Sequence, residues 1–250
     1  MTEPFLSIRG IRKTFGAFTA VKDVTMDVAE GEFMTFLGPS GSGKTVVQNF
    51  MLAQLERFDA QQLFIDKDRG AEIGIRAMGG KYFPLKRGAP TGFNPFQLEP
   101  TAHNLQFCEK LIRQFIKTAG QDLPLLSAKE QHEISHAVRI VMSEAVSREV
   151  RCLSLIMQNL PATGENSVKA RLKKWTRGHP LGWAFDNPSD TQDFSGASLF
   201  GYDYTEFLDD PEIRTPIVAY LLHLTESLIT GDPFVYFMEE FWKPLQDSMF

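Results

Sequence analysis

The feature that most constrains this chain is a phosphate-binding signature at residues 38–45. The run Gly-Pro-Ser-Gly-Ser-Gly-Lys-Thr has the form G-x-x-x-x-G-K-[ST], which composition alone produces on the order of 1 time in 100 for a chain of this length. A short apolar run at residues 32–37 precedes it, and a helical pattern at residues 46–58 follows it. The signature therefore predicts a P-loop between a strand and a helix.

The residue types in this loop predict how a nucleotide, ATP, is held. Glycines let the backbone turn its N–H groups toward the β-phosphate, and the helix N-terminus adds positive potential. Lys44 is predicted to reach the β- and γ-phosphates, and the Thr45 hydroxyl to ligate Mg²⁺. The predicted nucleotide-binding residues are Gly38, Pro39, Ser40, Gly41, Ser42, Gly43, Lys44, Thr45 and Val46.

A P-loop enzyme also needs an acid at the end of a neighbouring strand. The apolar run at residues 234–238 is followed at once by Glu239 and Glu240. Glu239 stands where the magnesium-associated carboxylate is expected, although aspartate is more usual there, and Glu240 is predicted to orient the attacking water. The alternative is a pair of exposed glutamates at the start of a helix.

The hydrophobic pattern predicts an α/β fold with a parallel sheet. Strand, loop, helix and strand follow one another through residues 32–65, with the second strand at 62–65. Residues 38–100 are assigned to the P-loop core, 101–231 to a helical insertion, and 232–250 to the return of the chain to the sheet. Within the insertion, helices are predicted at residues 107–118, 128–146, 151–160, 167–177 and 215–230, and a loop at 178–201. Ser127 and Glu130 form a capping-box pattern before the second of these helices.

The composition excludes some classes of protein but does not indicate which reaction the protein catalyses. The net charge of −5 argues against wholesale coating of nucleic acid. Two cysteines, Cys108 and Cys152, form no disulfide framework and fit a reducing compartment. No apolar run approaches the roughly 20 residues of a transmembrane helix, and residues 1–10 lack the pattern of a signal peptide.

Three other groups of residues carry weaker signals. His132 and His136 match HExxH, a zinc-peptidase pattern, but no third ligand follows at a characteristic spacing, so the match is attributed to chance. A basic run around Trp175 is interpreted as a solvated helix face rather than a phosphate contact. The strand at 62–65 is followed by Asp66, Asp68 and Arg69. These residues could support the nucleotide, or they could form an ordinary salt-bridged strand end, and the sequence favours neither interpretation.

Residues 6–45, LSIRGIRKTFGAFTAVKDVTMDVAEGEFMTFLGPSGSGKT, resemble the amino-terminal end of ABC-transporter ATP-binding subunits of the polyamine/iron-import type. The resemblance implies a β-rich segment at residues 1–37 and places Phe15 where an aromatic ring stacks on adenine. The Q-loop, the LSGGQ signature and the switch histidine of those proteins are missing after Lys44.

From residue 38 to 250 the chain resembles the VirB/TrbE/CagE family of type IV secretion and conjugative-transfer ATPases. The matching segments are GKTVVQNFMLAQLERFDAQQLFIDKDRGAEIGIRAMGGKYFPL, TGFNPFQL, RCLSLIMQNLP, KKWTRGHPLGWAFDN, TEFLDDPEIRTPIVAYLLH and EEFWKPL. The resemblance implies Mg²⁺-dependent ATP hydrolysis in a hexamer that works with inner-membrane subunits, peripheral to the bacterial inner membrane on the cytoplasmic side. DNA and protein both remain open as the transported substrate.

Because the two resemblances meet at the P-loop, a junction is predicted near residues 38–45. The chain stops soon after Glu240, so the RecA-like sheet is expected to be incomplete and to lack the strands that carry an arginine finger in the transfer ATPases. Weak hydrolysis is therefore expected. The alternatives are an ABC-type ATP-binding subunit and an assembly module that binds nucleotide without turnover.

Overall fold

The computed structural model describes residues 4–32, 34–36, 43–117, 126–229 and 231–246. Its centre is a four-stranded sheet in which every neighbouring pair is parallel, in the order β4-β5-β3-β6. The strands are β3 (Gln61–Asp66), β4 (Lys81–Pro84), β5 (Leu199–Asp203) and β6 (Phe234–Met238). This arrangement confirms the predicted α/β class.

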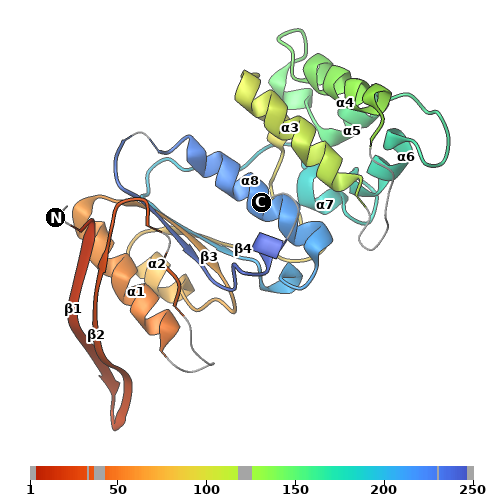
Figure 1. Ribbon diagram of the computed structural model, residues 1–250. Helices are drawn as coiled ribbons and strands as arrows, with labels where there is room; N and C mark the ends of the chain where they lie inside the picture. Colours follow the sequence, from red (N-terminus) through yellow and green to blue (C-terminus); the bar gives the residue numbers. More distant parts are fainter. Residues whose placement is uncertain (1–3, 33, 37–42, 118–125, 230, 247–250) are drawn as a thin grey trace.

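The two faces of the sheet are covered by different parts of the chain (Figure 1). On one face lie α1 (Lys44–Leu55) and α2 (Glu72–Ala77), and an antiparallel hairpin of β1 (Leu6–Phe15) and β2 (Phe18–Val28) packs beside α1. On the other face lies α8 (Pro211–Glu226). Side chains alternate across β3, so Phe64 packs toward α1 while Leu63 and Ile65 pack toward α8.

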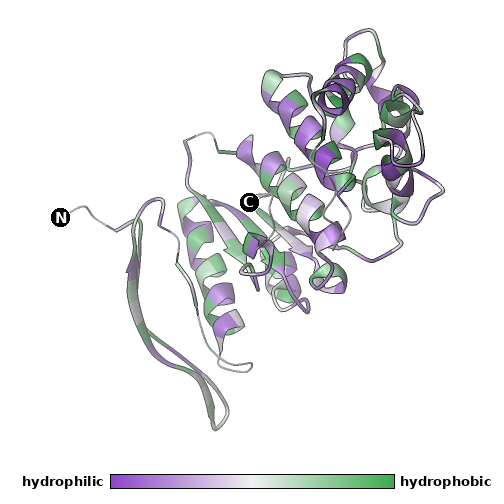
Figure 2. Ribbon diagram, turned by 45° about the vertical axis from the view of Figure 1, so that its right-hand side comes forward, coloured by the Kyte–Doolittle hydropathy of each residue, from purple (hydrophilic) through white to green (hydrophobic). Residues whose placement is uncertain are grey.

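A helical block extends from the α8 side of the sheet (Figures 1 and 2). It contains α3 (Ala102–Phe115), α4 (Ala128–Val141), α5 (Leu153–Gln158), α6 (Val168–Leu172) and α7 (Gly182–Phe185). Trp175 is fully buried within it, stacks on Phe115 with ring centroids 4.5 Å apart, and donates its indole N–H to the Phe115 carbonyl. Since this core is continuous with Phe200 and Tyr202 of the sheet, block and sheet form one hydrophobic cluster.

The structure corrects several predicted elements. Residues 178–201 were predicted as loop, yet β5 begins at Leu199 and lies between β4 and β3, so the chain rejoins the sheet inside the segment 101–231 assigned to helices. The short elements α2 and β4 were not predicted. At 32–37, the described residues 32 and 34–36 form no strand, because Glu32 closes a turn in which its N–H donates to the Ala29 carbonyl at 3.2 Å.

The capping box before α4 is confirmed. The Ser127 hydroxyl accepts the Glu130 N–H at 3.2 Å, and the Glu130 carboxylate accepts the Ser127 N–H at 2.9 Å. Ser127→Ala is expected to lower the free energy of unfolding by about 1 kcal/mol, because the Glu130 N–H loses the hydroxyl oxygen that caps it. Urea denaturation measures this loss, and Ser127→Thr, which keeps the hydroxyl, is the control. Equal stability of the alanine and threonine variants would contradict the assignment.

Candidate nucleotide site

The described part of the P-loop is its carboxyl end. Gly38, Pro39, Ser40, Gly41 and Ser42 lie outside the described residues, and their predicted contacts with phosphate stay predictions. Gly43 precedes α1 with φ 86°, a left-handed conformation that favours glycine. Lys44 and Thr45 are therefore the first two residues of α1, at the helix end where free N–H groups favour an anion.

The structure brings Thr45 and Glu239 together across 194 positions of sequence. The Thr45 hydroxyl donates to Oε1 of Glu239 at 3.2 Å, and the N–H of Lys67 donates to Oε2 at 3.1 Å. The N–H of Glu239 in turn donates to the Ile65 carbonyl at 3.0 Å, which continues the pairing of β6 with β3. The predicted metal-associated acid thus lies beside the predicted metal-binding hydroxyl.

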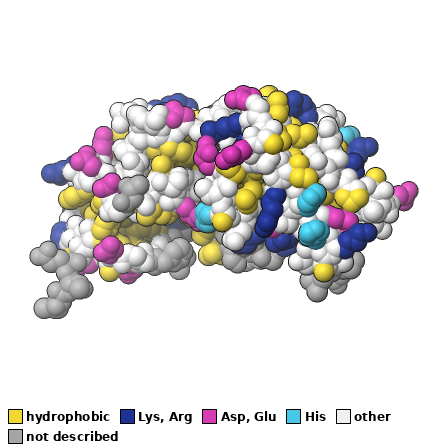
Figure 3. Space-filling view, turned by 90° about the horizontal axis from the view of Figure 1, so that it is seen from above, with side chains coloured by type: hydrophobic (Ala, Val, Ile, Leu, Met, Phe, Trp, Pro, Cys, Tyr) yellow, Lys and Arg dark blue, Asp and Glu magenta, His cyan; other side chains and the backbone are white. Residues whose placement is uncertain are grey.

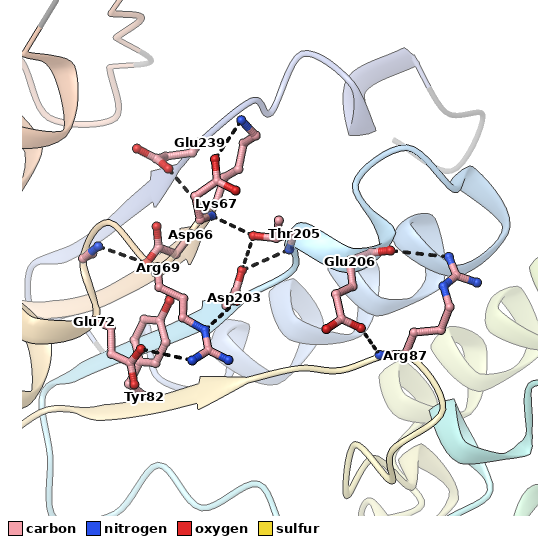
Figure 4. Close-up of polar contacts among 12 residues, drawn as sticks. Asp66, Lys67, Arg69, Glu72, Tyr82, Arg87, Asp203, Thr205, Glu206 and Glu239 are labelled. Carbon is pink, nitrogen blue, oxygen red and sulfur yellow. Dashed lines mark hydrogen bonds and ion pairs between the residues drawn. The ribbon is translucent and has the colours of Figure 1, made fainter. Parts of the chain in front are cut away.

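Asp66 adds a second carboxylate at this place (Figure 4). It is fully buried at the end of β3, where Oδ2 accepts the Tyr82 hydroxyl at 2.6 Å and the Ala71 N–H at 3.0 Å. Oδ1 is buried without a hydrogen-bond partner among the described residues. Hydroxyl and carboxylate oxygens are the donors that Mg²⁺ prefers, so Thr45, Glu239 and this orphaned oxygen fit such an ion.

Burial dominates the electrostatics of the two acids. It raises the pKa of Asp66, and it also raises the pKa of Glu239, with the nearby negative charge of Asp66 as a further cause. Two carboxylates at one buried place disfavour each other's ionised form. A cation placed between them would relieve this repulsion.

This pair predicts how stability without nucleotide depends on pH. The folded chain holds these protons more tightly than the unfolded chain. The pair's contribution to stability is therefore fully present below the ordinary carboxyl pKa values of 3.8 and 4.5, and it is lost as pH rises through the raised values. Glu239→Gln removes one charge and offers an amide donor near Asp66. At pH 7 without nucleotide or metal it is expected to be about 1 kcal/mol more stable than the wild type.

Urea denaturation between pH 4 and pH 8 measures this difference, which should shrink toward pH 4. Glu240→Gln is the matched control, since the Glu240 carboxylate accepts the Trp242 indole N–H at 2.8 Å instead of joining the pair. A Glu239→Gln variant less stable than the wild type at pH 7 would contradict the interpretation.

Glu240 follows Glu239 in an unusual backbone conformation. Its φ is 52°, in the left-handed region that residues other than glycine rarely adopt. Such strain concentrates at functional sites. The role of Glu240 in orienting water stays a prediction, as do the roles of Lys44 and of Val46, whose side chain packs against the hydrophobic cluster around α1. The Phe15 side chain lies outside what the structure describes, so its stacking on adenine also stays a prediction.

The carboxyl ends of β3 and β5 carry a polar network. Its β3 side contains Asp68 and Arg69, for which the sequence left a salt-bridged strand end open, and its partners at the end of β5 and just after it were not predicted. Arg69 pairs with Asp203 at 3.3 Å, and Asp203 Oδ1 accepts the Thr205 N–H at 3.0 Å. The Thr205 hydroxyl accepts the Asp68 N–H at 2.7 Å (Figure 4). The sequence did contain a signal for this network, because Asp203 ends the largely apolar run at 199–203. That run was overlooked because it lies at the edge of the predicted loop at 178–201.

The other sequence candidates do not form a site in the described residues. His132 and His136 are exposed on α4, and no third metal ligand accompanies them there. In the basic run, Arg171 pairs with Glu130 at 3.0 Å and Lys174 pairs with Glu212. Basic and acidic side chains are interspersed on the face drawn in Figure 3.

A comparison with models of protein families shows which family this chain belongs to. Residues 20–162, more than half of the sequence, match the model described as the TraG P-loop domain. The chain belongs to the TraG P-loop domain family. This match spans the predicted junction at residues 38–45 and begins inside the segment compared with ABC subunits, so it does not support that part of the interpretation.

Curated relatives are proteins of type IV secretion systems. VirB4 of Brucella abortus (strain 9-941) is 42% identical over 231 residues, which cover 86% of this chain and 27% of the relative. PtlC of Bordetella pertussis (strain Tohama I) is 44% identical over 229 residues, with the same shares. The chain spans about a quarter of the length of these relatives. They support the predicted resemblance to type IV secretion ATPases.

A solved structure shows the same fold. The structure of VirB4 of Thermoanaerobacter pseudethanolicus superposes with a TM-score of 0.64 at 14% identity and covers 83% of this chain and 60% of that one. Together with the TraG match, it confirms a P-loop NTPase fold. Among the described residues, no helix has the length and apolar character that crossing a bilayer requires.

Proposed function

We propose that this chain binds ATP with Mg²⁺ and hydrolyses it as the energising segment of a type IV secretion or conjugative-transfer machine. The observation that carries the proposal is the contact between the Thr45 hydroxyl and the Glu239 carboxylate at the carboxyl edge of the sheet. Parallel α/β sheets bind their ligands at this edge.

Each residue of the site has a proposed task. Gly43 and Lys44 hold phosphate at the start of α1, and Thr45 and Glu239 hold the metal, with Asp66 beside them. Mg²⁺ held by these residues would supply charge neutralisation at the phosphates. Glu240 orients the attacking water and accepts its proton. The Trp242 indole N–H donates to Oε2 of Glu240, and a carboxylate has further acceptor sites that remain for the water.

The cellular setting is proposed from the relatives. Their names place them in type IV secretion systems, so the expected partners are inner-membrane subunits of such a system, with the chain at the cytoplasmic face of the bacterial inner membrane. Assembly into a hexamer, implied by the resemblance to transfer ATPases, is part of the same proposal.

The proposal is tested by measuring ATP binding and phosphate release on the same purified chain. ATP with Mg²⁺ is expected to raise the melting temperature, and EDTA to remove most of this effect. Phosphate release that depends on Mg²⁺ supports hydrolysis. Stabilisation without phosphate release would contradict hydrolysis and identify an assembly module, and no response to ATP would overturn the whole proposal.

A further inference from the structure

A second group of residues that could bind a metal lies where α3 of the helical block packs against α8. His103 stands in the first turn of α3, and His223 and Glu226 lie one turn apart at the end of α8. One ligand atom from each of the three lies within 4.8 Å of the others. All three line one surface pocket.

The hydrogen bonds around His223 fix which ring nitrogen carries the proton. The Asn104 amide donates from Nδ2 to the Glu99 carbonyl at 2.9 Å, so its Oδ1 faces His223 Nε2 at 2.8 Å. An amide oxygen only accepts, and therefore Nε2 holds the proton. In the neutral ring, Nδ1 then presents a lone pair.

That lone pair faces another acceptor. His223 Nδ1 lies 3.5 Å from Oε2 of Glu226, and the same oxygen lies 2.7 Å from Nε2 of His103. The Glu226 carboxylate therefore lies beside two imidazole nitrogens, and a cation bound by all three groups would separate the lone pair from the carboxylate.

The ring of His223 is also held in place for this task. It stacks on Phe107 with centroids 3.8 Å apart and planes 2° from parallel. A histidine that ligates a metal usually donates its other ring N–H to an oxygen, which fixes the tautomer and the orientation of the ring. Asn104 supplies that oxygen here.

We propose that His103, His223 and Glu226 bind a divalent transition-metal ion of the zinc class. Two imidazole nitrogens and one carboxylate oxygen are a three-ligand set typical of zinc, with a fourth position left for water or a partner's ligand. The ion would link α3 of the helical block to α8. Because α8 runs back from the carboxyl ends of the strands, this site lies at the opposite edge of the sheet from Thr45 and Glu239.

The test is a zinc titration of the full chain without nucleotide. After EDTA treatment and buffer exchange, the chain is titrated with Zn²⁺ against a chromophoric chelator, and with Co²⁺ to record the visible absorption of a low-coordinate site. His103→Ala and Glu226→Gln change side chains that are 66% and 53% exposed, so both variants should fold. Each is expected to weaken Zn²⁺ binding at least tenfold and to remove the Co²⁺ absorption.

The matched control is the double variant His132→Ala/His136→Ala, which removes the other histidine pair on exposed helix surface. It should bind one Zn²⁺ per chain as the wild type does. The proposal is overturned if the wild type does not bind Zn²⁺ at micromolar concentration, if the control loses the binding, or if His103→Ala and Glu226→Gln both bind like the wild type. None of these outcomes depends on ATP binding, so failure here is separable from failure of the nucleotide site.

Discussion

Lys44→Ala is expected to lower kcat/KM for ATP by about 10²–10³-fold and to abolish most of the ATP-induced rise in melting temperature. Lys44 is the first residue of α1 and follows the left-handed Gly43, so its ammonium group starts from the helix end that binds phosphate. Removing one preorganised charge that stabilises the transferring phosphoryl group has an effect of this size. Phosphate release and thermal melting with ATP and Mg²⁺ measure both quantities.

A lysine elsewhere on the sheet supplies the control. Lys81 begins β4 at the amino edge, where its ammonium group contacts Asp193 at 2.8 Å. Lys81→Ala should leave both measurements within about twofold of the wild type, because the substituted side chain is remote from the phosphate end of α1. If Lys44→Ala and Lys81→Ala behave alike, Lys44 does not bind the nucleotide.

Glu240→Gln is expected to lower kcat by about 10²–10³-fold while ATP still binds. The glutamine side chain keeps the size of glutamate but cannot take a proton from water, and general-base catalysis contributes an effect of this order. Retained binding is expected because Thr45 and Glu239, which hold the metal in the proposed site, are unchanged. Single-turnover phosphate release and ATP-induced stabilisation separate the two effects.

An acid on the same side of the sheet serves as the comparison. Glu72 opens α2 and pairs with Arg76 at 3.0 Å, so Glu72→Gln removes a carboxylate without touching the proposed water. Its kcat should stay within about threefold of the wild type, since the carboxylate is occupied by Arg76 and has no part in the proposed site. A Glu240→Gln chain with wild-type kcat would exclude Glu240 as the base.

The sequence predicted β3 and β6 because both contain an unbroken apolar run, at residues 63–65 and 234–238. Strand β3 is buried on both faces, whereas β6 lies at the edge of the sheet and is mostly half-buried. The sequence missed β5, where Gly201 interrupts the run and a segment rich in Asp and Ser comes just before. Only the packed sheet explains that glycine, since a Cβ there would lie 2.4 Å from the Tyr82 ring. Strand β4 is too short, at four residues, for its pattern to stand out.

The two proposed metal sites also differ in how far the sequence alone could predict them. The pairing of Thr45 with Glu239 was predictable, since the P-loop motif and an acid after an apolar strand are each local signals. Nothing local marks the orphaned Oδ1 of Asp66, because it is buried only in the packed protein, where Tyr82 and Ala71 donate to the other oxygen, Oδ2. His103 and His223 stand 120 positions apart and meet only because α3 packs on α8.

The position of β5 next to β4 makes the whole helical block a single crossover connection. Two neighbouring parallel strands need a connection of only about a dozen residues, whereas here residues 85–198 lie between them. In topology the block could be exchanged for a short helix without altering the order of the sheet. In energy it could not, because the core of the block is continuous with the buried side chains of Phe200 and Tyr202 on the sheet. Any remodelling of this protein must therefore replace the apolar cover of the sheet before it shortens the connection.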